Sequence, residues 1–167
     1  MKTAQRKAAR AKQARRHAGH MDRDDLIAHN PVAQAMVRQQ IEADIRALRT
    51  RAGIHAHMGA DVPVLADACG RLVYVVAHAA RLHGLEESPE ARILAGTANA
   101  LGDIVAIPAS LEANRPAVLS GLDACERLLP ALNTWALAAG AKAMDAILAQ
   151  RDFTAGDVRE ALGGGAA

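Results

Sequence analysis

Apolar side chains recur every three to five residues along most of this chain, between residues that start and stop helices. In the first such segment, one stripe is formed by Val32, Met36, Ile41, Ile45 and Leu48. This spacing is typical of a helix that buries one face. No stretch alternates apolar and polar residues with a period of two, so β-strands are not expected. The sequence therefore predicts an all-α fold.

Capping residues and prolines divide the chain into about five helices. Asn30-Pro31 and Ser88-Pro89 each place a capping side chain before a proline at the first helical position, and Asp61 precedes a similar start. Because an internal proline removes a backbone hydrogen bond, we expect a kink or a break near Pro130. The predicted bundle has helices at 31–51, 62–83, 89–107, 116–150 (kinked at Pro130) and 154–162.

The second and third helices offer different surfaces. Helix 62–83 is apolar on more than one face, and we expect it to be the central helix. Helix 89–107 has small residues between Ala95 and Gly102, which let a neighbouring helix approach closely. We expect residues 22–167 to form a single helical domain behind a basic, flexible arm at residues 1–21.

Composition excludes several classes of protein. Apolar residues make up 51% of the 167 residues, and 40 of them are alanine. The longest apolar runs are much shorter than the ~18 residues that span a bilayer, so no transmembrane helix is expected. Residues 1–20 lack the apolar region of a secretory signal, and we expect a cytoplasmic protein. The bias towards alanine and arginine is typical of a GC-rich genome, as in bacteria and their phages.

Charge is distributed unevenly along the chain. Residues 1–20 contain seven basic side chains and no acid, whereas the other 147 residues carry a net charge of −5. A basic segment attached to an acidic body is typical of proteins with a polyanionic partner. The basic residues of the arm are Lys2, Arg6, Lys7, Arg10, Lys12, Arg15 and Arg16.

The first functional hypothesis is a non-enzymatic protein that grips the phosphates of DNA or RNA through this arm. Closely spaced cations gain affinity by releasing the counterions condensed on phosphates. Helices 31–51 and 62–83 are too long and too far apart for a helix-turn-helix, so we expect little base discrimination. The alternatives for the arm are an acidic protein partner or a solvated tail with no specific partner. A membrane is not expected, because the arm lacks an apolar face.

The second hypothesis is a helical adaptor or regulator that binds another protein through an apolar groove, with the arm incidental. Long alanine-rich helices leave smooth surfaces that also favour a homo-oligomer. Trp135 is predicted to be a core residue or an oligomer contact.

Signals for metal binding or catalysis are weak. His55, His57 and Asp61 are residue types that zinc accepts, but the pattern is short and more typical of loop histidines. Cys69 and Cys125 fall on core faces, where a reduced thiol acts as a small apolar group. No catalytic constellation is found, so neither an enzyme nor a cofactor is expected.

A six-residue pattern occurs twice. Residues 67–72 read Asp-Ala-Cys-Gly-Arg-Leu and residues 123–128 read Asp-Ala-Cys-Glu-Arg-Leu. The match is either chance or a duplication, in which two helices, each with its copy early in the helix, would face each other through their cysteines. In each copy the aspartate and arginine are expected to pair at the i, i+4 spacing.

Overall fold

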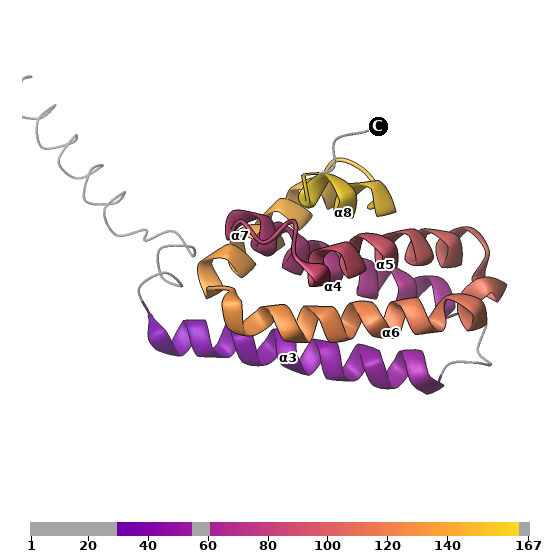
Figure 1. Ribbon diagram of the computed structural model, residues 1–167, viewed down its shortest axis with the longest axis horizontal. Coiled ribbons are helices and arrows are strands. Elements are labelled where there is room, and N and C mark those ends of the chain that lie inside the picture. Colours follow the sequence, from indigo (N-terminus) through magenta and orange to yellow (C-terminus); the bar gives the residue numbers. More distant parts are fainter. Residues whose placement is uncertain (1–29, 55–60, 164–167) are drawn as a thin grey trace, which may run out of the picture.

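The computed structural model describes residues 30–54 and 61–163, which form six α-helices, two short 3₁₀ helices and no strand. Figure 1 shows the helices packed as a bundle, with α3 and α6 running side by side along its length. The predicted all-α bundle is confirmed. The elements are α3 (Pro31–Ile54), α4 (Val62–Leu82), α5 (Pro89–Ala106), η1 (Pro108–Ser110), α6 (Leu111–Leu128), η2 (Leu129–Ala131), α7 (Thr134–Leu148) and α8 (Ala155–Ala161).

The helices that follow Asn30, Asp61 and Ser88 start where the sequence places them, but only two of these three starts have a side-chain cap. The Asn30 side chain accepts a hydrogen bond from the Val32 amide at 2.9 Å, and the Ser88 hydroxyl accepts one from the Ala91 amide at 3.1 Å. Asp61 holds the N-cap position of α4 without a capping bond, because its backbone is helical rather than extended.

The helical stretch predicted at 116–150 is interrupted by the expected break, so it forms two helices. Pro130 lies in η2, which breaks the chain between α6 and α7. Moreover, α6 begins at Leu111, five residues before Pro116, which lies inside the helix. Leu111 is buried, and Glu112 pairs with Arg115 at 2.6 Å. These contacts secure the first turn despite the hydrogen bond that the proline removes.

Helix α4 is the central helix, as predicted, since it contacts α3, α5, α6, α7 and α8. Within the described residues it is also the one helix long and apolar enough to cross a membrane, and 61% of that window is buried in the bundle. The core helix of a bundle has the same length and composition. Gly84 ends this region with a left-handed backbone (φ +67°), which glycine adopts without strain.

Two glycines allow the closest helix contacts. At Gly121 of α6, an added Cβ would overlap the side chain of Thr97 on α5. At Gly140 of α7, it would lie 2.7 Å from the carbonyl oxygen of Val75 on α4. The small residues of α5 were expected to allow close approach, and this is confirmed at Gly102, where an added Cβ would lie 3.2 Å from the Ala155 side chain of α8. At Gly96 an added Cβ meets nothing within 4 Å. The glycine that brings α5 and α6 together is therefore on α6.

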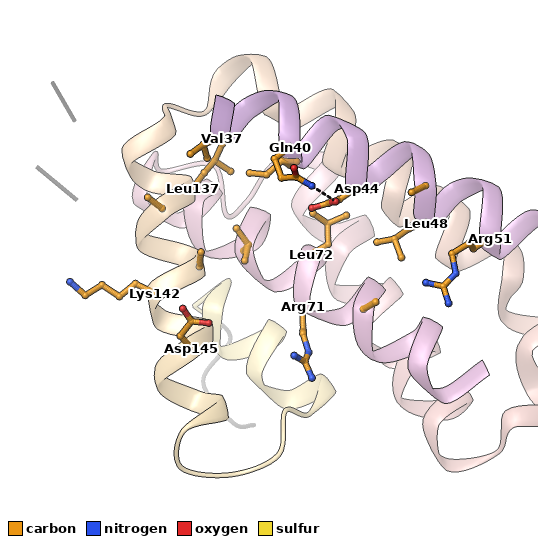
Figure 2. Close-up of a pocket in the computed structure, with 16 residues that line it drawn as sticks. Val37, Gln40, Asp44, Leu48, Arg51, Arg71, Leu72, Leu137, Lys142 and Asp145 are labelled. Atoms are coloured by element: carbon orange, nitrogen blue, oxygen red, sulfur yellow. Dashed lines mark hydrogen bonds between the residues drawn. The ribbon is translucent and has the colours of Figure 1, made fainter. Parts of the chain in front are cut away.

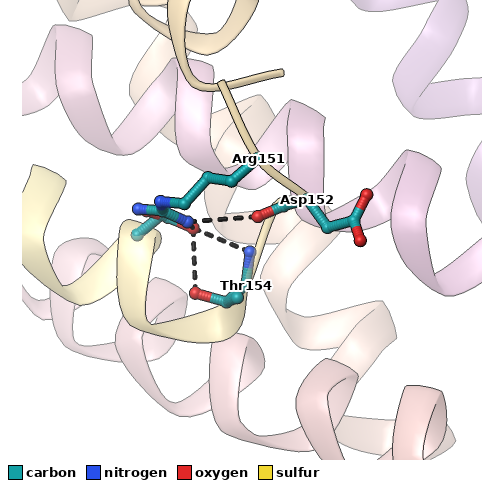
Figure 3. Close-up of polar contacts among 4 residues, drawn as sticks. Arg151, Asp152 and Thr154 are labelled. Atoms are coloured by element: carbon teal, nitrogen blue, oxygen red, sulfur yellow. Dashed lines mark hydrogen bonds and ion pairs between the residues drawn. The ribbon is translucent and has the colours of Figure 1, made fainter. Parts of the chain in front are cut away.

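An aromatic contact attaches the α8 region to α4, and a buried carboxylate ties the first turn of α8 to the segment before it. The Phe153 ring lies over Gly70, 2.8 Å from where a Cβ would be, and meets Tyr74 edge-on. The buried Asp157 accepts two hydrogen bonds from Arg151. The Thr154 amide donates a further hydrogen bond to this carboxylate at 2.7 Å, and Figure 3 shows Arg151 and Thr154 close together at this contact.

The repeated six-residue pattern is not matched by repeated structure. The first copy lies in the first half of α4, whereas the second occupies the last six residues of α6. The expected pair between Asp67 and Arg71 is confirmed at 2.6 Å. The expected pair between Asp123 and Arg127 is wrong, because the helices packed on α6 supply other partners. Arg49 binds Asp123 and Glu126, and Glu90 pairs with Arg127.

Candidate binding groove

An open groove of about 820 Å³ lies between α3, α4 and α7. Its apolar surface comes mainly from aliphatic side chains and small alanines of the three helices. Figure 2 shows Val37 and Leu137 together at one end, Leu72 in the middle and Arg51 at the far end. The larger apolar residues that line it are Val37, Ile41, Leu48, Leu72, Val75 and Leu137. A concave apolar surface of this size is large enough to hold a ligand.

The groove stays open because polar contacts hold α3 towards α6. Near the start of α3, Arg38 donates hydrogen bonds to the backbone carbonyls of Leu129 and Leu132, at 2.8 and 2.7 Å. Further along, Arg49 contacts Asp123 and Glu126 of α6, both at 2.6 Å. The hydrogen bond with Glu126 is the main cause of a raised Arg49 pKa. One side of α3 is thus packed, and the side that faces α4 and α7 is only partly covered.

Charged side chains surround the apolar surface. Three cations line the groove, Arg51 from α3, Arg71 from α4 and Lys142 from α7, together with the anions Asp44 and Asp145. In Figure 2, Arg51 and Arg71 lie on opposite walls. Arg71 keeps its ion pair with Asp67, and Asp44 accepts a hydrogen bond from Gln40 at 2.8 Å. A ligand would therefore meet an apolar floor with a mixed but net positive edge.

Apolar surface continues beyond the groove. Trp135 is 50% exposed and lies with alanines of α7 beside a smaller hollow that shares Ala138 and Lys142 with the groove. The prediction that Trp135 is a core residue is therefore wrong, and its role as an oligomer contact stays a prediction. Val32 and Met36, predicted to be buried, are 67% and 65% exposed, since none of the described helices covers the first turns of α3 on that side.

The sequence-predicted sites are placed only in part. The basic residues of the arm, and His55 and His57, lie outside the described residues, so the arm stays a prediction. Asp61 lies at the start of α4. In residues 30–54 and 61–163, no three side chains of His, Cys, Asp or Glu come close enough together to hold a metal ion.

The two cysteines are buried, as predicted, and reduced. Burial raises the pKa of Cys69 to about 12. Burial also raises the pKa of Cys125, and the nearby Cys69 raises it further. Thiols that are not ionised at neutral pH are poor nucleophiles. These side chains therefore act as small core residues.

Most basic side chains of the bundle already have polar partners. The described residues include 12 Lys and Arg and 15 Asp and Glu, a net charge of −3. Several arginines form ion pairs within the bundle, namely Arg49, Arg71, Arg115, Arg127 and Arg151. The bundle is therefore acidic overall, and many of its cations are engaged with its own carboxylates.

No protein-family model, no curated protein and no solved structure matches this chain. The groove and the charge distribution are the features that bear on its function.

Proposed function

We propose that this protein is a helical binding module that holds an amphipathic helix of another protein in the groove between α3, α4 and α7. The observation that carries the proposal is the partly covered apolar surface formed by these three helices. Between Val37 and Arg51 the groove follows α3 for about 21 Å, at 1.5 Å per residue, which is the length of roughly four helical turns. Helix-in-groove recognition uses apolar anchors at i, i+3, i+4 and i+7, which fit such a length.

The charges around the groove define the chemistry of the partner. Three cations and two anions line it, so a helix whose flanks carry more carboxylates than cations would be favoured. Arg51 and Arg71 lie on opposite walls and would meet acids on either flank of the bound helix. Charge complementarity of this kind selects the partner and fixes its register more than it adds affinity.

A synthetic peptide tests this proposal. The probe is a fluorescent helix with leucine at the i, i+3, i+4 and i+7 positions and glutamate on its flanks. In the A141E variant a carboxylate enters the groove, because Ala141 lines it. We expect this variant to weaken binding about tenfold or more, since burying an unpaired charge costs more than 1.4 kcal/mol. Fluorescence anisotropy measures the affinity.

The matched control is A113E, because Ala113 is exposed on α6 outside the groove. It should bind like the parent. A second control is a peptide of the same composition with its leucines spread around the helix, which should bind weakly. Equal affinity of A141E and A113E for the amphipathic probe would contradict the proposal.

A second candidate function, binding of nucleic-acid phosphates through the arm, is favoured by the charge distribution. The arm has seven cations and no acid, while many arginines of the bundle are already paired. Phosphates would therefore be bound mainly by the arm. Five or six phosphate contacts give a slope of log affinity against log salt of about −5 on duplex DNA.

Replacing Arg6, Arg10, Arg15 and Arg16 together with glutamine tests this second candidate in the full chain. We expect the salt slope on duplex DNA to fall in magnitude from about −5 to about −1.4, because each of the four lost phosphate contacts removes ~0.9. The control is R92Q, which removes one exposed cation from α5. Affinity for DNA that is equal in the fourfold variant and the parent at low salt would reject this candidate.

A further inference from the structure

We propose that residues 21–29 of this chain occupy the groove themselves and compete there with the partner helix. The inference rests on the proposed function for the identity of the competitor, while occupancy of the groove is tested independently. Residues 21–29 lie outside the described part of the chain and directly precede Asn30, where α3 begins. They read Met-Asp-Arg-Asp-Asp-Leu-Ile-Ala-His.

This segment has the composition that the groove requires. Leu26 and Ile27 form an apolar pair, and Met21 adds a third large apolar side chain. Between Lys2 and His20 the chain has no apolar side chain larger than alanine, so the basic arm has nothing to bury on an apolar floor. Residues 21–29 are thus the part of the preceding chain that gains from covering Val37, Ile41 and Leu137.

The lengths match as well. Val37 lies about 10 Å along α3 from Asn30, and Leu48 about 27 Å, at 1.5 Å per residue. A chain that runs back along α3 from Asn30 covers at most ~3.3–3.6 Å per residue. Leu26 and Ile27 can therefore reach the end of the groove at Val37 and Leu137. Nine residues reach about 30 Å, which is enough to pass Leu48.

The charged residues of the segment also match charged residues of the groove. Beyond the apolar pair, the segment carries three aspartates and one arginine, Asp22, Arg23, Asp24 and Asp25. Counted back from Asn30, Asp22 reaches at most about 29 Å along α3. The Arg51 Cα lies about 32 Å along, with its side chain in the groove, and Arg71 lies on the opposite wall. Asp22 would face Arg51, and Arg23 can face Asp44 of the groove. The net charge of the segment is therefore opposite to that of the groove.

An internal occupant lowers the affinity for any external helix. If the segment fills the groove nine-tenths of the time, the apparent dissociation constant of a partner rises about tenfold. A partner helix would need to displace residues 21–29 from the groove.

Protection of an introduced thiol in the full chain tests the inference. Ala141 lines the groove and is exposed in the described structure, and the two native cysteines are buried. In A141C, an iodoacetamide reagent should react about tenfold more slowly than in the double variant L26D/I27D built on A141C, because occupancy limits access. A113C, on α6 outside the groove, should react at one rate in both backgrounds. Neutralising the three aspartates (D22N, D24N, D25N) should give an intermediate rate.

The outcomes separate this inference from the proposed function. Protection that is lost in L26D/I27D and does not depend on protein concentration supports the inference. Equal iodoacetamide reaction rates in A141C with and without L26D/I27D overturn it. Protection of the thiol that increases with protein concentration also overturns it, in favour of a second copy of the chain in the groove. The leucine–glutamate probe peptide gives the other readout. Tighter binding of the probe peptide by L26D/I27D than by the parent supports both proposals. Equal peptide binding together with an unprotected A141C thiol rejects only the inference. A protected thiol in a protein that does not bind the peptide rejects only the proposed function.

Discussion

Replacing Gly140 with valine is expected to destabilise the bundle by about 3 kcal/mol, the upper part of the range for overpacking. An added Cβ would lie 2.7 Å from the Val75 carbonyl oxygen and 3.2 Å from its Cα. Both are backbone atoms in the middle of α4, which cannot move aside by changing a rotamer. Helix α7 would have to shift away from the core. Urea unfolding followed by circular dichroism measures the loss.

The matched control is G96V. Gly96 is also inside a helix, but an added Cβ meets nothing within 4 Å. Valine has a higher helix propensity than glycine by a few tenths of a kcal/mol, so G96V should be neutral or slightly stabilising. G140V should also weaken binding of the probe peptide, because Leu137, Ala138 and Ala141 of α7 line the groove. Equal stability of G140V and G96V would show that the α4–α7 contact is not close.

The second large effect is expected at Asp157, which anchors α8. Hydrogen bonds from Arg151 are the main cause of a lowered Asp157 pKa, and burial opposes them. A carboxyl group with a lowered pKa in the folded protein stabilises the fold when ionised. This contribution is complete above the ordinary pKa near 4 and is lost as the pH falls through the folded value. In D157N the charge is absent at every pH, so we expect a loss of about 2 kcal/mol at neutral pH.

The pH dependence identifies the cause. The difference in urea unfolding free energy between the parent and D157N should be constant near neutral pH and shrink once the pH falls below about 4, because the parent then loses its own Asp157 charge. The other carboxylates are present in both proteins and cancel in the comparison. A difference that stays constant with pH would contradict the assigned role of the Asp157 charge.

Local signals predicted most of the helices, and contacts between helices explain the misses. The caps at Asn30 and Ser88 act within one turn, so their positions follow from the sequence alone. The start of α6 depends instead on Leu111, whose burial against the core outweighs Pro116. In the same way, the partners of Asp123 and Arg127 were missed, since Arg49 and Glu90 are distant in sequence.

The groove could not be located from periodicity. The positions of Ile41, Leu72 and Leu137 have the same apolar spacing as core residues, because periodicity shows which face of a helix is apolar but not whether a neighbour covers it. That coverage depends on Arg38 and Arg49, which hold α3 towards η2 and α6. The sequence did indicate an apolar groove as one hypothesis, without its residues.

The three aromatic residues of the chain occupy two separate places. Tyr74 and Phe153 form the contact between α4 and α8, while the single tryptophan, Trp135, lies half exposed beside the groove on α7. The chain contains one tyrosine and one tryptophan. Ultraviolet spectroscopy of the unlabelled protein therefore has two independent signals. Tyrosine absorbance follows the attachment of α8, and tryptophan emission follows events at the groove.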